Sequence, residues 1–306
     1  MSSGATAHIR NHLVVGVDGS AESGRAVRWA AYEAALRGLP LRVVHGFVWP
    51  AAAMNFEAPT YLSDEPSFHN AAQQVLAEAA ETAREAVPDL TVETDLVEEA
   101  GGAAALLQYS GDAAILVVGD RGLGGFSGLI VGSIAVQLAM HAPCPVVVVR
   151  GGEPDPSRRS ASSNRNSRIV VGVDASDHAA AALAFAFEEA AFRGAPLHAL
   201  HAWTEPTSTG PGDMIPLVYD PELVQQEEAR LEAELLAGWS EKYPDVVVTR
   251  EVARGRARDT LIAASRDAQL LVVGARGVGG FRGLLFGSVS QAALHHADCP
   301  VAVVRP

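Results

Sequence analysis

The sequence predicts an α/β protein made of two similar doubly wound domains, each a five-stranded parallel sheet with helices on both faces. Three observations support this fold class. The chain has 306 residues, enough for two domains that each bury a core of their own. Its two halves repeat one sequence pattern, and within each half short valine-rich segments alternate with longer helix-like segments.

The repeat is visible in two strings. The segment LVVGVDGS at 13–20 returns as IVVGVDAS at 169–176, an offset of 156 residues. A glycine-rich string at 119–133 returns at 274–288, an offset of 155 residues. We therefore predict a duplicated domain that has lost one residue between its second strand and the glycine-rich string.

In the first half, apolar runs and helical periodicity predict the elements in order. Strands are expected at 12–17, 41–48, 91–97, 113–119 and 145–150. Helices are expected at 22–37, in an alanine-rich segment that ends near Val87, at 102–110 and at 133–141. Gly38 and Pro88 follow two of these helices and are typical helix stop signals.

The second half predicts the same order of elements. Strands are expected at 168–173, 197–203, 246–253, 269–274 and 300–305, and helices at 177–193, 221–243, 256–266 and 288–296. Between the halves, residues 151–167 consist mainly of proline, glycine, serine and charged residues, a composition typical of a linker. We predict one domain at 8–150, a linker at 151–167 and a second domain at 168–306.

The composition excludes several functions. The net charge of −13 argues against general nucleic-acid binding, which needs a basic surface. No apolar run approaches the length of a membrane span, and the first residues lack a signal-peptide pattern. The two cysteines, Cys144 and Cys299, imply no disulfide framework. We therefore expect a cytoplasmic protein with no membrane span.

The glycine-rich strings predict a phosphate site. Residues 119–133 contain glycines at 119, 122, 124, 125, 128 and 132, and they end in Ser133 at the start of a predicted helix. Dense glycines let the backbone approach a ligand closely, and a helix N-terminus supplies N–H groups and partial positive charge. Ten of sixteen positions agree between 119–134 and 274–289, more than the packing of a turn requires.

Asp18 and Asp174 follow the first strand of each half, and Gly119 and Gly274 follow the fourth. If the first and fourth strands are neighbours, the carboxylate and the glycine-rich loop share the crevice where open α/β sheets bind ligands. This arrangement suits a nucleotide, with backbone amides and the helix-start serine on the phosphates. The aspartate would contact ribose hydroxyls or a bound Mg²⁺, and backbone near Val17, Gly46, Val173 and Ala202 would contact the base.

Other glycine-rich loops fit less well. A Walker A loop requires a lysine, and the only lysine of the chain is Lys242. A dinucleotide-binding loop follows the first strand with the spacing G-x-G-x-x-G, whereas these glycines follow the fourth strand. A purely structural glycine loop is the main alternative.

The residues now quoted resemble a known family. Gly119, Gly122, Gly132 and Ser133 match G-x2-G-x9-G-[ST], and Gly274, Gly277, Gly287 and Ser288 match it again. With V-G-V-D-x-S around each aspartate and C-P-V-x-V-V near each half's end, the chain resembles a tandem universal stress protein of the ATP-binding, actinobacterial type. The resemblance covers all but the linker and the first ten residues.

The resemblance implies a Rossmann-like nucleotide-binding sheet with ATP in each domain, and pairing of the domains through their last strands. It also implies a role in stress response or dormancy, exerted through ATP occupancy and an unidentified regulatory protein partner. A homodimer is a further expectation. The expected nucleotide contacts in the first half are Gly16, Val17, Asp18, Gly46, Gly119, Arg121, Gly122, Leu123, Gly124, Gly125, Gly132, Ser133 and Ile134. Those in the second half are Gly172, Val173, Asp174, Ala202, Gly274, Arg276, Gly277, Val278, Gly279, Gly280, Gly287, Ser288 and Val289.

Several residues have two interpretations. Arg121 and Arg276 could donate to phosphate or remain solvated. His45 and His201, which end the second strand of each half, fit a packed and hydrogen-bonded histidine better than a base contact. The cysteines fit buried, inert thiols better than redox sensors. His141, His295 and His296 lack a metal-ligand pattern.

Arg254 stands opposite Glu99 in the alignment of the two halves. If this position lies near the phosphates, the second site favours a polyanion more than the first.

Two functions remain open at this stage. The first is an ATP-binding regulatory protein without dedicated catalysis, in which Asp18 and Asp174 could hold Mg²⁺ that arrives with ATP. The second is a slow ATPase or nucleotidyl-transfer enzyme on the same fold. Catalysis usually needs a positioned base, an electrophile stabiliser and a metal held by two carboxylates, whereas each site offers one aspartate. The residues favour binding over turnover.

Overall fold

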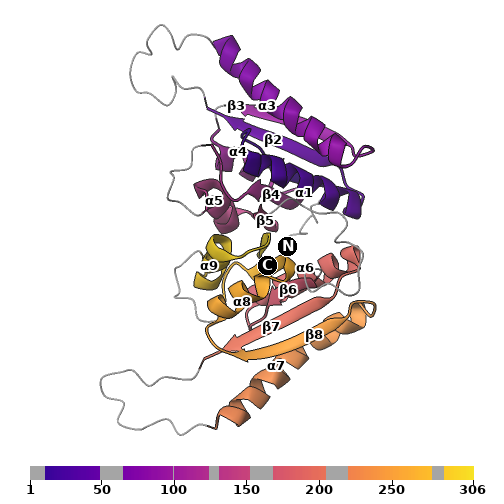
Figure 1. Ribbon diagram of the computed structural model, residues 1–306, viewed down its shortest axis with the longest axis vertical. Helices are drawn as coiled ribbons and strands as arrows, with labels where there is room; N and C mark the ends of the chain where they lie inside the picture. Colours follow the sequence, from indigo (N-terminus) through magenta and orange to yellow (C-terminus); the bar gives the residue numbers. More distant parts are fainter. Residues whose placement is uncertain are drawn as a thin grey trace, which may run out of the picture. The chain divides into compact units, whose positions relative to one another are not determined.

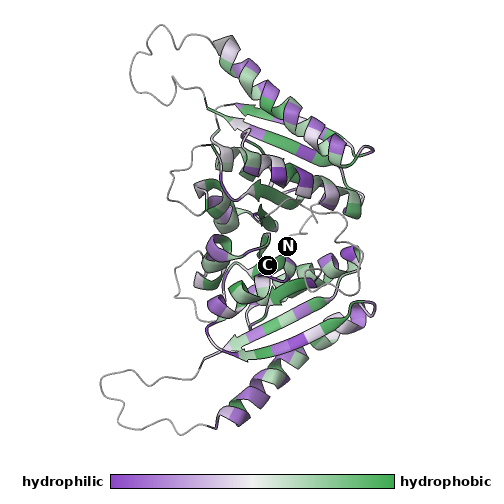
Figure 2. Cartoon of the chain, in the orientation of Figure 1, coloured by the Kyte–Doolittle hydropathy of each residue, from purple (hydrophilic) through white to green (hydrophobic). Residues whose placement is uncertain are grey.

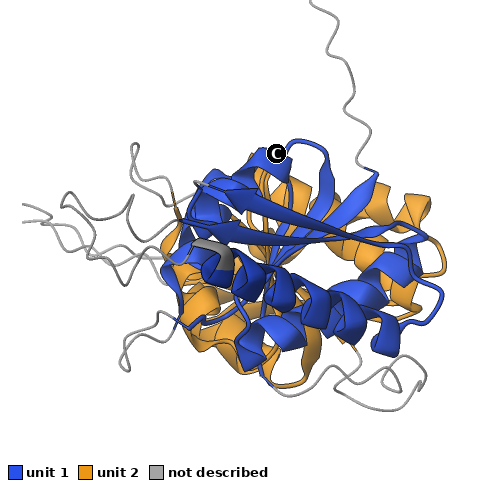
Figure 3. Ribbon diagram, turned by 90° about the horizontal axis from the view of Figure 1, so that it is seen from above, with its two compact units in different colours: residues 1–156 blue, residues 157–306 orange. Residues whose placement is uncertain are grey.

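The chain divides into two compact units, residues 1–156 and residues 157–306, which we call unit one and unit two (Figure 3). The computed structural model describes residues 11–48, 65–98, 100–123, 131–151, 168–204, 220–277 and 286–306. Residues 152–167 lie outside this range, so the linker and the domain boundaries that flank it stay predictions.

Unit one alternates strands and helices along the chain (Figure 1). Its elements are β1 (His12–Gly16), α1 (Ala21–Arg37), β2 (Leu41–Phe47), α3 (Glu65–Ala86), β3 (Val92–Glu98), α4 (Gly102–Tyr109), β4 (Ala113–Gly119), α5 (Ser133–His141) and β5 (Val146–Val149). The strands pair in parallel in the order β3-β2-β1-β4-β5.

Unit two repeats this order (Figure 1). Its elements are β6 (Arg168–Gly172), α6 (Asp177–Arg193), β7 (Leu197–Trp203), α7 (Pro221–Lys242), β8 (Val248–Arg254), α8 (Ala257–Ser265), β9 (Ala268–Gly274), α9 (Ser288–His296) and β10 (Val301–Val304). The strands pair in parallel in the order β8-β7-β6-β9-β10. The predicted doubly wound fold is confirmed in both units.

The first and fourth strands of each unit are neighbours, as the function prediction required. Val15 of β1 pairs with Val43 of β2 on one side and with Val117 of β4 on the other. After β1 the chain adds β2 and β3 on one side of it, and then crosses to add β4 and β5 on the other side. The strand order therefore reverses between β1 and β4. This reversal opens a crevice beyond the carboxyl ends of these strands.

Helices cover both faces of the sheet in unit one (Figure 1). On one face, α4 lies so close to β1 that a Cβ at Gly16 would lie 2.5 Å from Leu106 Cδ1. On the other face, α1 lies so close to β4 that a Cβ at Gly119 would lie 2.9 Å from the backbone of Glu22. Glycine at these two strand ends therefore permits close helix packing.

Burial on both faces explains the valine-rich central strands (Figure 2). Val14, Val15 and Val117 are completely buried. The edge strand β3 is different, because it carries Glu93 and Asp95, which form ion pairs with Arg42 of β2. Charges on an edge strand oppose unwanted pairing with another sheet.

The two ends of α1 follow sequence signals. The side chain of Ser20 accepts a hydrogen bond from the Ser23 N–H at 3.1 Å and caps the N-terminus. Gly38 ends the helix with φ of 64°, in the left-handed region that favours glycine. Helix α6 has the same caps at Ser176 and Gly194, so the local signals were duplicated with the domain.

The observed boundaries agree closely with those predicted; the largest shift is in β8, which begins at Val248 instead of 246. The structure also shows more closely where the second half lost its one residue. The ends of β3 and β8, Glu98 and Arg254, keep the offset of 156, whereas α4 and α8 begin at Gly102 and Ala257, an offset of 155. The deletion therefore lies in the connection that enters α4 and α8.

We predict opposite effects of the same substitution at two glycines of unit one. Gly38→Ala should lower the free energy of unfolding by about 1–2 kcal/mol, because an L side chain is strained at positive φ. Gly24→Ala should raise it by up to about 1 kcal/mol, because Gly24 lies inside α1 and a Cβ there would come no closer than 4.0 Å to another group. Urea unfolding followed by circular dichroism measures both, and a stabilised Gly38→Ala variant would contradict the assigned cap.

Candidate functional site

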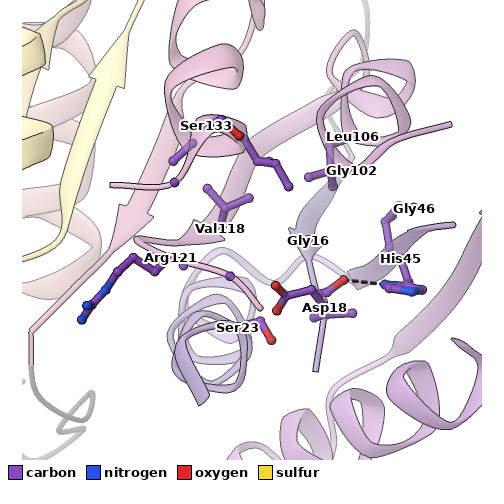
Figure 4. A pocket seen from close by; sticks show the side chains of 17 residues that line it. Gly16, Asp18, Ser23, His45, Gly46, Gly102, Leu106, Val118, Arg121 and Ser133 are labelled. Carbon is purple, nitrogen blue, oxygen red and sulfur yellow. Dashed lines mark hydrogen bonds between the residues drawn. The ribbon is translucent and has the colours of Figure 1, made fainter. Parts of the chain in front are cut away.

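Unit one contains a cavity of about 450 Å³ at the carboxyl ends of β1, β2 and β4 (Figure 4). It is lined by Gly16, Val17, Asp18, Ser23, Val44, His45, Gly46, Gly102, Leu106, Val118, Gly119, Arg121, Gly122, Gly132, Ser133, Ile134 and Ala135. Figure 4 shows Asp18 and Ser23 across the cavity from Ser133 and Leu106. The cavity occupies the crevice predicted from the strand order.

Ten of the predicted contact residues of the first half line this cavity: Gly16, Val17, Asp18, Gly46, Gly119, Arg121, Gly122, Gly132, Ser133 and Ile134. Leu123 does not line it, and its side chain is 73% exposed. Gly124 and Gly125 lie outside the described residues. The tertiary structure thus brings together segments that are more than one hundred residues apart in the sequence.

The sequence analysis missed seven lining residues as contacts: Ser23, Val44, His45, Gly102, Leu106, Val118 and Ala135. Most are apolar or small residues inside predicted elements, and their patterns are explained by core packing. The signal that could have found Gly102 is the Gly101–Gly102 pair at the start of the helix predicted at 102–110. Such a pair leaves a helix N-terminus without side chains, which suits a ligand.

Asp18 connects three parts of the site. Its Oδ1 accepts hydrogen bonds from the Ser20 backbone N–H at 3.0 Å and the Ser20 hydroxyl at 2.6 Å. Its Oδ2 accepts one from the backbone N–H of Leu123 at 2.8 Å. Burial by itself would raise the pKa of Asp18, but the hydrogen bonds from Ser20 and Leu123 outweigh it, and the pKa lies below its ordinary value. The carboxylate therefore stays ionised at neutral pH.

The same carboxylate explains the second glycine of the loop motif. A Cβ at Gly122 would overlap Asp18 Oδ2, and a Cβ at Gly277 would overlap Asp174 Oδ2 in unit two. Each aspartate lies directly against the loop backbone, so a side chain at this position would displace the carboxylate. The absence of a side chain at Gly122 and Gly277 therefore lets the carboxylate contact the loop backbone.

Two helix N-termini point at the cavity. Gly102 is the first residue of α4 and Ser133 the first of α5, and both line the cavity. Their N-caps are Gly101 and Gly132, which offer no side chain to the first N–H groups of either helix. Unsatisfied N–H groups and the positive end of the helix dipole favour an anion at this place.

The histidines at the ends of β2 and β7 are hydrogen-bonded, as expected. His45 Nδ1 donates to the Val17 carbonyl at 2.7 Å, and His201 Nδ1 donates to the Val173 carbonyl at 2.8 Å. The Val17 N–H is also used, because it donates to the Val44 carbonyl at 3.0 Å. Backbone groups of Val17 are therefore already engaged, although its carbonyl keeps a second lone pair.

Arg121 lies at the edge of the cavity. Its guanidinium points away from Asp18 in Figure 4, and the side chain is 55% exposed. Its Nε lies 4.0 Å from Oδ2 of Asp120, whose buried carboxylate is also 3.9 Å from Nη2 of Arg25. A phosphate in the cavity would thus compete with Asp120 for Arg121.

Unit two places the corresponding residues in the same way. Asp174 Oδ1 accepts from the Ser176 N–H at 3.0 Å and its hydroxyl at 2.5 Å, and Gly277 lies against Oδ2. The Gly287 N–H donates to the Ala275 carbonyl at 2.9 Å, as the Gly132 N–H does to the Asp120 carbonyl at 2.7 Å.

The remaining predicted residues of unit two lie at equivalent positions. Gly172 ends β6, Gly274 ends β9, Ala202 lies near the end of β7, Arg276 follows β9, and Ser288 and Val289 begin α9. Val278, Gly279 and Gly280 lie outside the described residues.

The predicted comparison of Arg254 with Glu99 is wrong. Strand register pairs Glu98 with Phe47 and Arg254 with Trp203, so Arg254 corresponds to Glu98. Glu98 Oε1 lies 3.2 Å from Nδ1 of His69 of α3, which places this position on the face of the sheet opposite to α4. It therefore lies away from the helix N-termini that favour an anion. Glu99 itself lies outside the described residues.

The two cysteines have the expected buried surroundings. Cys144 and Cys299 are buried and form no disulfide. Within the described part of the chain, no cluster of three or more His, Cys, Asp or Glu side chains could hold a metal ion. No helix in that part is long and apolar enough to cross a membrane.

Comparisons with known proteins agree with this architecture. The model of the universal stress protein family matches residues 10–150 and 165–305. The chain is 38% identical over 301 residues to a universal stress protein of Mycolicibacterium smegmatis, covering 96% of this chain and 97% of that protein. It is also 38% identical over 305 residues to one of Mycobacterium tuberculosis, covering 96% of each. A crystal structure of a universal stress protein from Archaeoglobus fulgidus shares the fold, with a TM-score of 0.67, 19% identity and 97% of each chain covered.

We predict that Asp18 contributes stability in a pH-dependent way. Asp18→Asn should lower the free energy of unfolding at pH 7 by about 1–3 kcal/mol, because an amide cannot accept all three hydrogen bonds. The folded pKa of Asp18 lies below its ordinary value of 3.8. Its contribution is therefore present above about pH 3.8 and is lost as the pH falls through the lower folded value. The difference between wild type and variant should shrink below that pH.

Urea unfolding at a series of pH values measures this difference. Asp89→Asn serves as a control, because Asp89 is an exposed carboxylate in the turn after α3 and should leave the pH 7 midpoint unchanged. A difference between wild type and Asp18→Asn that grows on acidification would contradict the assigned hydrogen bonds.

Proposed function

The chain belongs to the universal stress protein family, and on that premise we propose that it is an ATP-binding regulatory protein with one nucleotide site in each unit. Site one is the cavity at Asp18, and site two is the equivalent region at Asp174. One observation supports the proposal above all others. In unit one an ionised carboxylate, a glycine-rich loop and two helix N-termini meet at a single cavity.

The size and lining of the cavity fit a nucleotide. A volume of about 450 Å³ lies within the usual range for small-molecule sites, roughly 300–1,000 Å³. Leu106, Val118 and Ile134 supply apolar surface for a base. The α5 N-terminus at Ser133 supplies N–H groups for phosphates without a lysine. In our proposal the Asp18 carboxylate accepts hydrogen bonds from ribose hydroxyls, and backbone near Val17 and Gly46 contacts the base.

Mg²⁺ fits the same arrangement when it arrives with ATP. Asp18 is ionised at neutral pH, and carboxylate oxygens are ligands that Mg²⁺ prefers. Since Mg²⁺ usually binds one or two protein carboxylates together with substrate phosphates and waters, a single aspartate is sufficient. As the alternative to contact with the ribose, we propose that Asp18 in site one and Asp174 in site two would hold the ion.

The geometry favours nucleotide binding over turnover. A general base is most effective when its pKa lies near the working pH, whereas hydrogen bonds lower the pKa of Asp18. Both carboxylate oxygens of Asp18 also hold the local backbone through Ser20 and Leu123. The alternative, a slow ATPase or nucleotidyl-transfer enzyme, would need these groups to rearrange.

We propose a regulatory role, because a protein that binds ATP without consuming it can signal through its nucleotide occupancy. In this proposal, a regulatory protein partner detects nucleotide occupancy during stress or dormancy in the cytoplasm. Pairing of the two units through their last strands, and of two chains in a homodimer, stay predictions.

The test uses a charge placed at the α5 N-terminus. Ser133→Glu should lower the ATP affinity of site one at least about tenfold, because the new carboxylate repels phosphate. The same glutamate should not destabilise the protein, because an acidic residue at a helix N-terminus is favourable by about 0.3–1 kcal/mol. Denaturing the purified protein and quantifying released nucleotide, together with calorimetric titration of ATP, measures the loss.

The matched control is Gln137→Glu, one turn further along α5. Gln137 is exposed and does not line the cavity, so the same added charge should leave binding nearly unchanged. Wild-type ATP affinity in Ser133→Glu would remove the α5 N-terminus from the site. Purified wild type that neither contains nor binds nucleotide would refute the proposed function.

We further expect ATP turnover far below about 1 s⁻¹, the usual lower bound for dedicated enzymes. The reason is the lowered pKa of Asp18, which makes its carboxylate a weak base. Release of inorganic phosphate by the purified full chain measures the rate. Faster hydrolysis that Asp18→Asn abolishes would establish the enzymatic alternative instead.

A further inference from the structure

The two sites carry different charges at equivalent positions, and we infer from this that they bind nucleotides of different phosphate number. Site two is assigned to nucleoside triphosphates, whereas site one discriminates little between mono-, di- and triphosphates. This inference rests on the proposed function. The residues responsible are Arg256 in place of Gly101 and Ala275 in place of Asp120.

Arg256 occupies the N-cap position of α8, as Gly101 does for α4. A Cβ at Gly101 would meet no atom within 4 Å, so a side chain at this position extends into open space. Arg256 is correspondingly exposed. A cation at a helix N-terminus is unfavourable, because it repels the positive end of the helix dipole. Local helix stability therefore does not explain the arginine, but a bound anion would.

This N-cap lies next to the proposed phosphate position. In unit one, a Cβ at Gly102 would lie 2.7 Å from Cδ1 of Ile134, so the start of α4 touches the start of α5. Gly102, Ser133 and Ile134 all line the cavity. Helices α8 and α9 pack against each other in the same way in unit two. Arg256 is thus one residue before the start of α8, the helix that adjoins α9.

The second difference lies directly after β4 and β9. In unit one the carboxylate of Asp120 is buried and lies 3.9 Å from Arg25 and 4.0 Å from Arg121. Its negative charge is shared between Arg25 and Arg121, so it competes with a phosphate for Arg121. In unit two this residue is Ala275 and the counterpart of Arg25 is Ala181, so no carboxylate at this position competes for Arg276.

Arg276 acts on two neighbouring basic groups, Arg305 and His178, and the carboxylates of Asp177 and Asp174 also act on His178. Burial and the charge of Arg276 lower the pKa of Arg305. Burial, Arg276 and Arg305 lower the pKa of His178, against the opposing charges of Asp177 and Asp174. Nδ1 of His178 is buried and has no hydrogen-bond partner within the described part of the chain. Cations that repel one another are stabilised by an added anion, and more so by each further phosphate.

Arg256 follows β8 and precedes α8, which contacts α9, and Arg276 follows β9 in the connection that leads to α9. A triphosphate in site two could therefore receive charge-assisted hydrogen bonds from both. In site one, Gly101 supplies no charge and Asp120 competes for Arg121, so additional phosphates gain less.

The test compares the two sites in the full chain. Ser133→Glu weakens site one, so that site two can be titrated, and Ser288→Glu does the reverse. Calorimetric titrations with AMP, ADP and ATP at fixed Mg²⁺ give the ratio of ATP to AMP affinity. We expect this ratio to be at least about tenfold larger at site two, the effect of one charge-assisted phosphate contact.

Exchanging the two N-cap residues isolates their effect. Arg256→Gly should reduce the ratio at site two toward that of site one with little change in AMP affinity, and Gly101→Arg should raise the ratio at site one. Both variants should fold, because glycine is a good N-cap and position 101 is open. Arg266→Gly, at the other end of α8, removes the same charge and should change nothing.

The outcomes separate the two proposals. Equal ratios at both sites, or a ratio at site two that Arg256→Gly leaves unchanged, would overturn this inference while nucleotide binding stands. A wild-type protein that binds none of the three nucleotides would overturn the proposed function itself.

Discussion

The site depends on the hydrogen bonds that the Asp18 carboxylate accepts. One carboxylate accepts hydrogen bonds from the start of α1, through Ser20, and from the loop after β4, through Leu123. It thereby joins two segments that are distant in the sequence, at the edge where the strand order reverses. The burial that opposes its charge is outweighed by these bonds, so the carboxylate is held ionised beside the cavity. Asp174 and Ser176 repeat the arrangement in unit two.

The glycines of the loop motif serve different physical purposes. Gly119 allows α1 to pack closely on the end of β4, and Gly122 allows Asp18 to lie against the loop backbone. Gly132 is the N-cap of α5 and leaves the first N–H groups of this helix facing the cavity. A single motif therefore combines a packing constraint, a loop contact and a helix N-terminus that we propose binds an anion. This combination explains why a structural and a functional interpretation of the motif are not exclusive.

Duplication preserved the backbone of the site while the charges around it diverged. The caps of α1 and α6, the aspartates and the loop glycines are the same in both units. The N-cap residue is Gly101 in α4 and Arg256 in α8, and Asp120 of unit one corresponds to Ala275 of unit two. One position is open to solvent, and at the other Ala275 keeps both backbone hydrogen bonds that Asp120 makes, through its N–H and its carbonyl. Such positions can alter ligand preference without affecting the sheet.

The sequence by itself determined the elements, the duplication and most of the backbone that lines the cavity, because hydrophobic periodicity, caps and glycines are local signals. Tertiary structure decided which side chains meet. Leu106 and Ile134 line the cavity, although their sequence pattern is explained by core packing alone. Strand register showed that Arg254 corresponds to Glu98, whose side chain lies on the other face of the sheet, so Arg256 is the arginine that we place near the proposed phosphate position. The physical reason is that a one-residue deletion between a strand and a helix changes which side chain faces the ligand, and no local pattern records where it occurred.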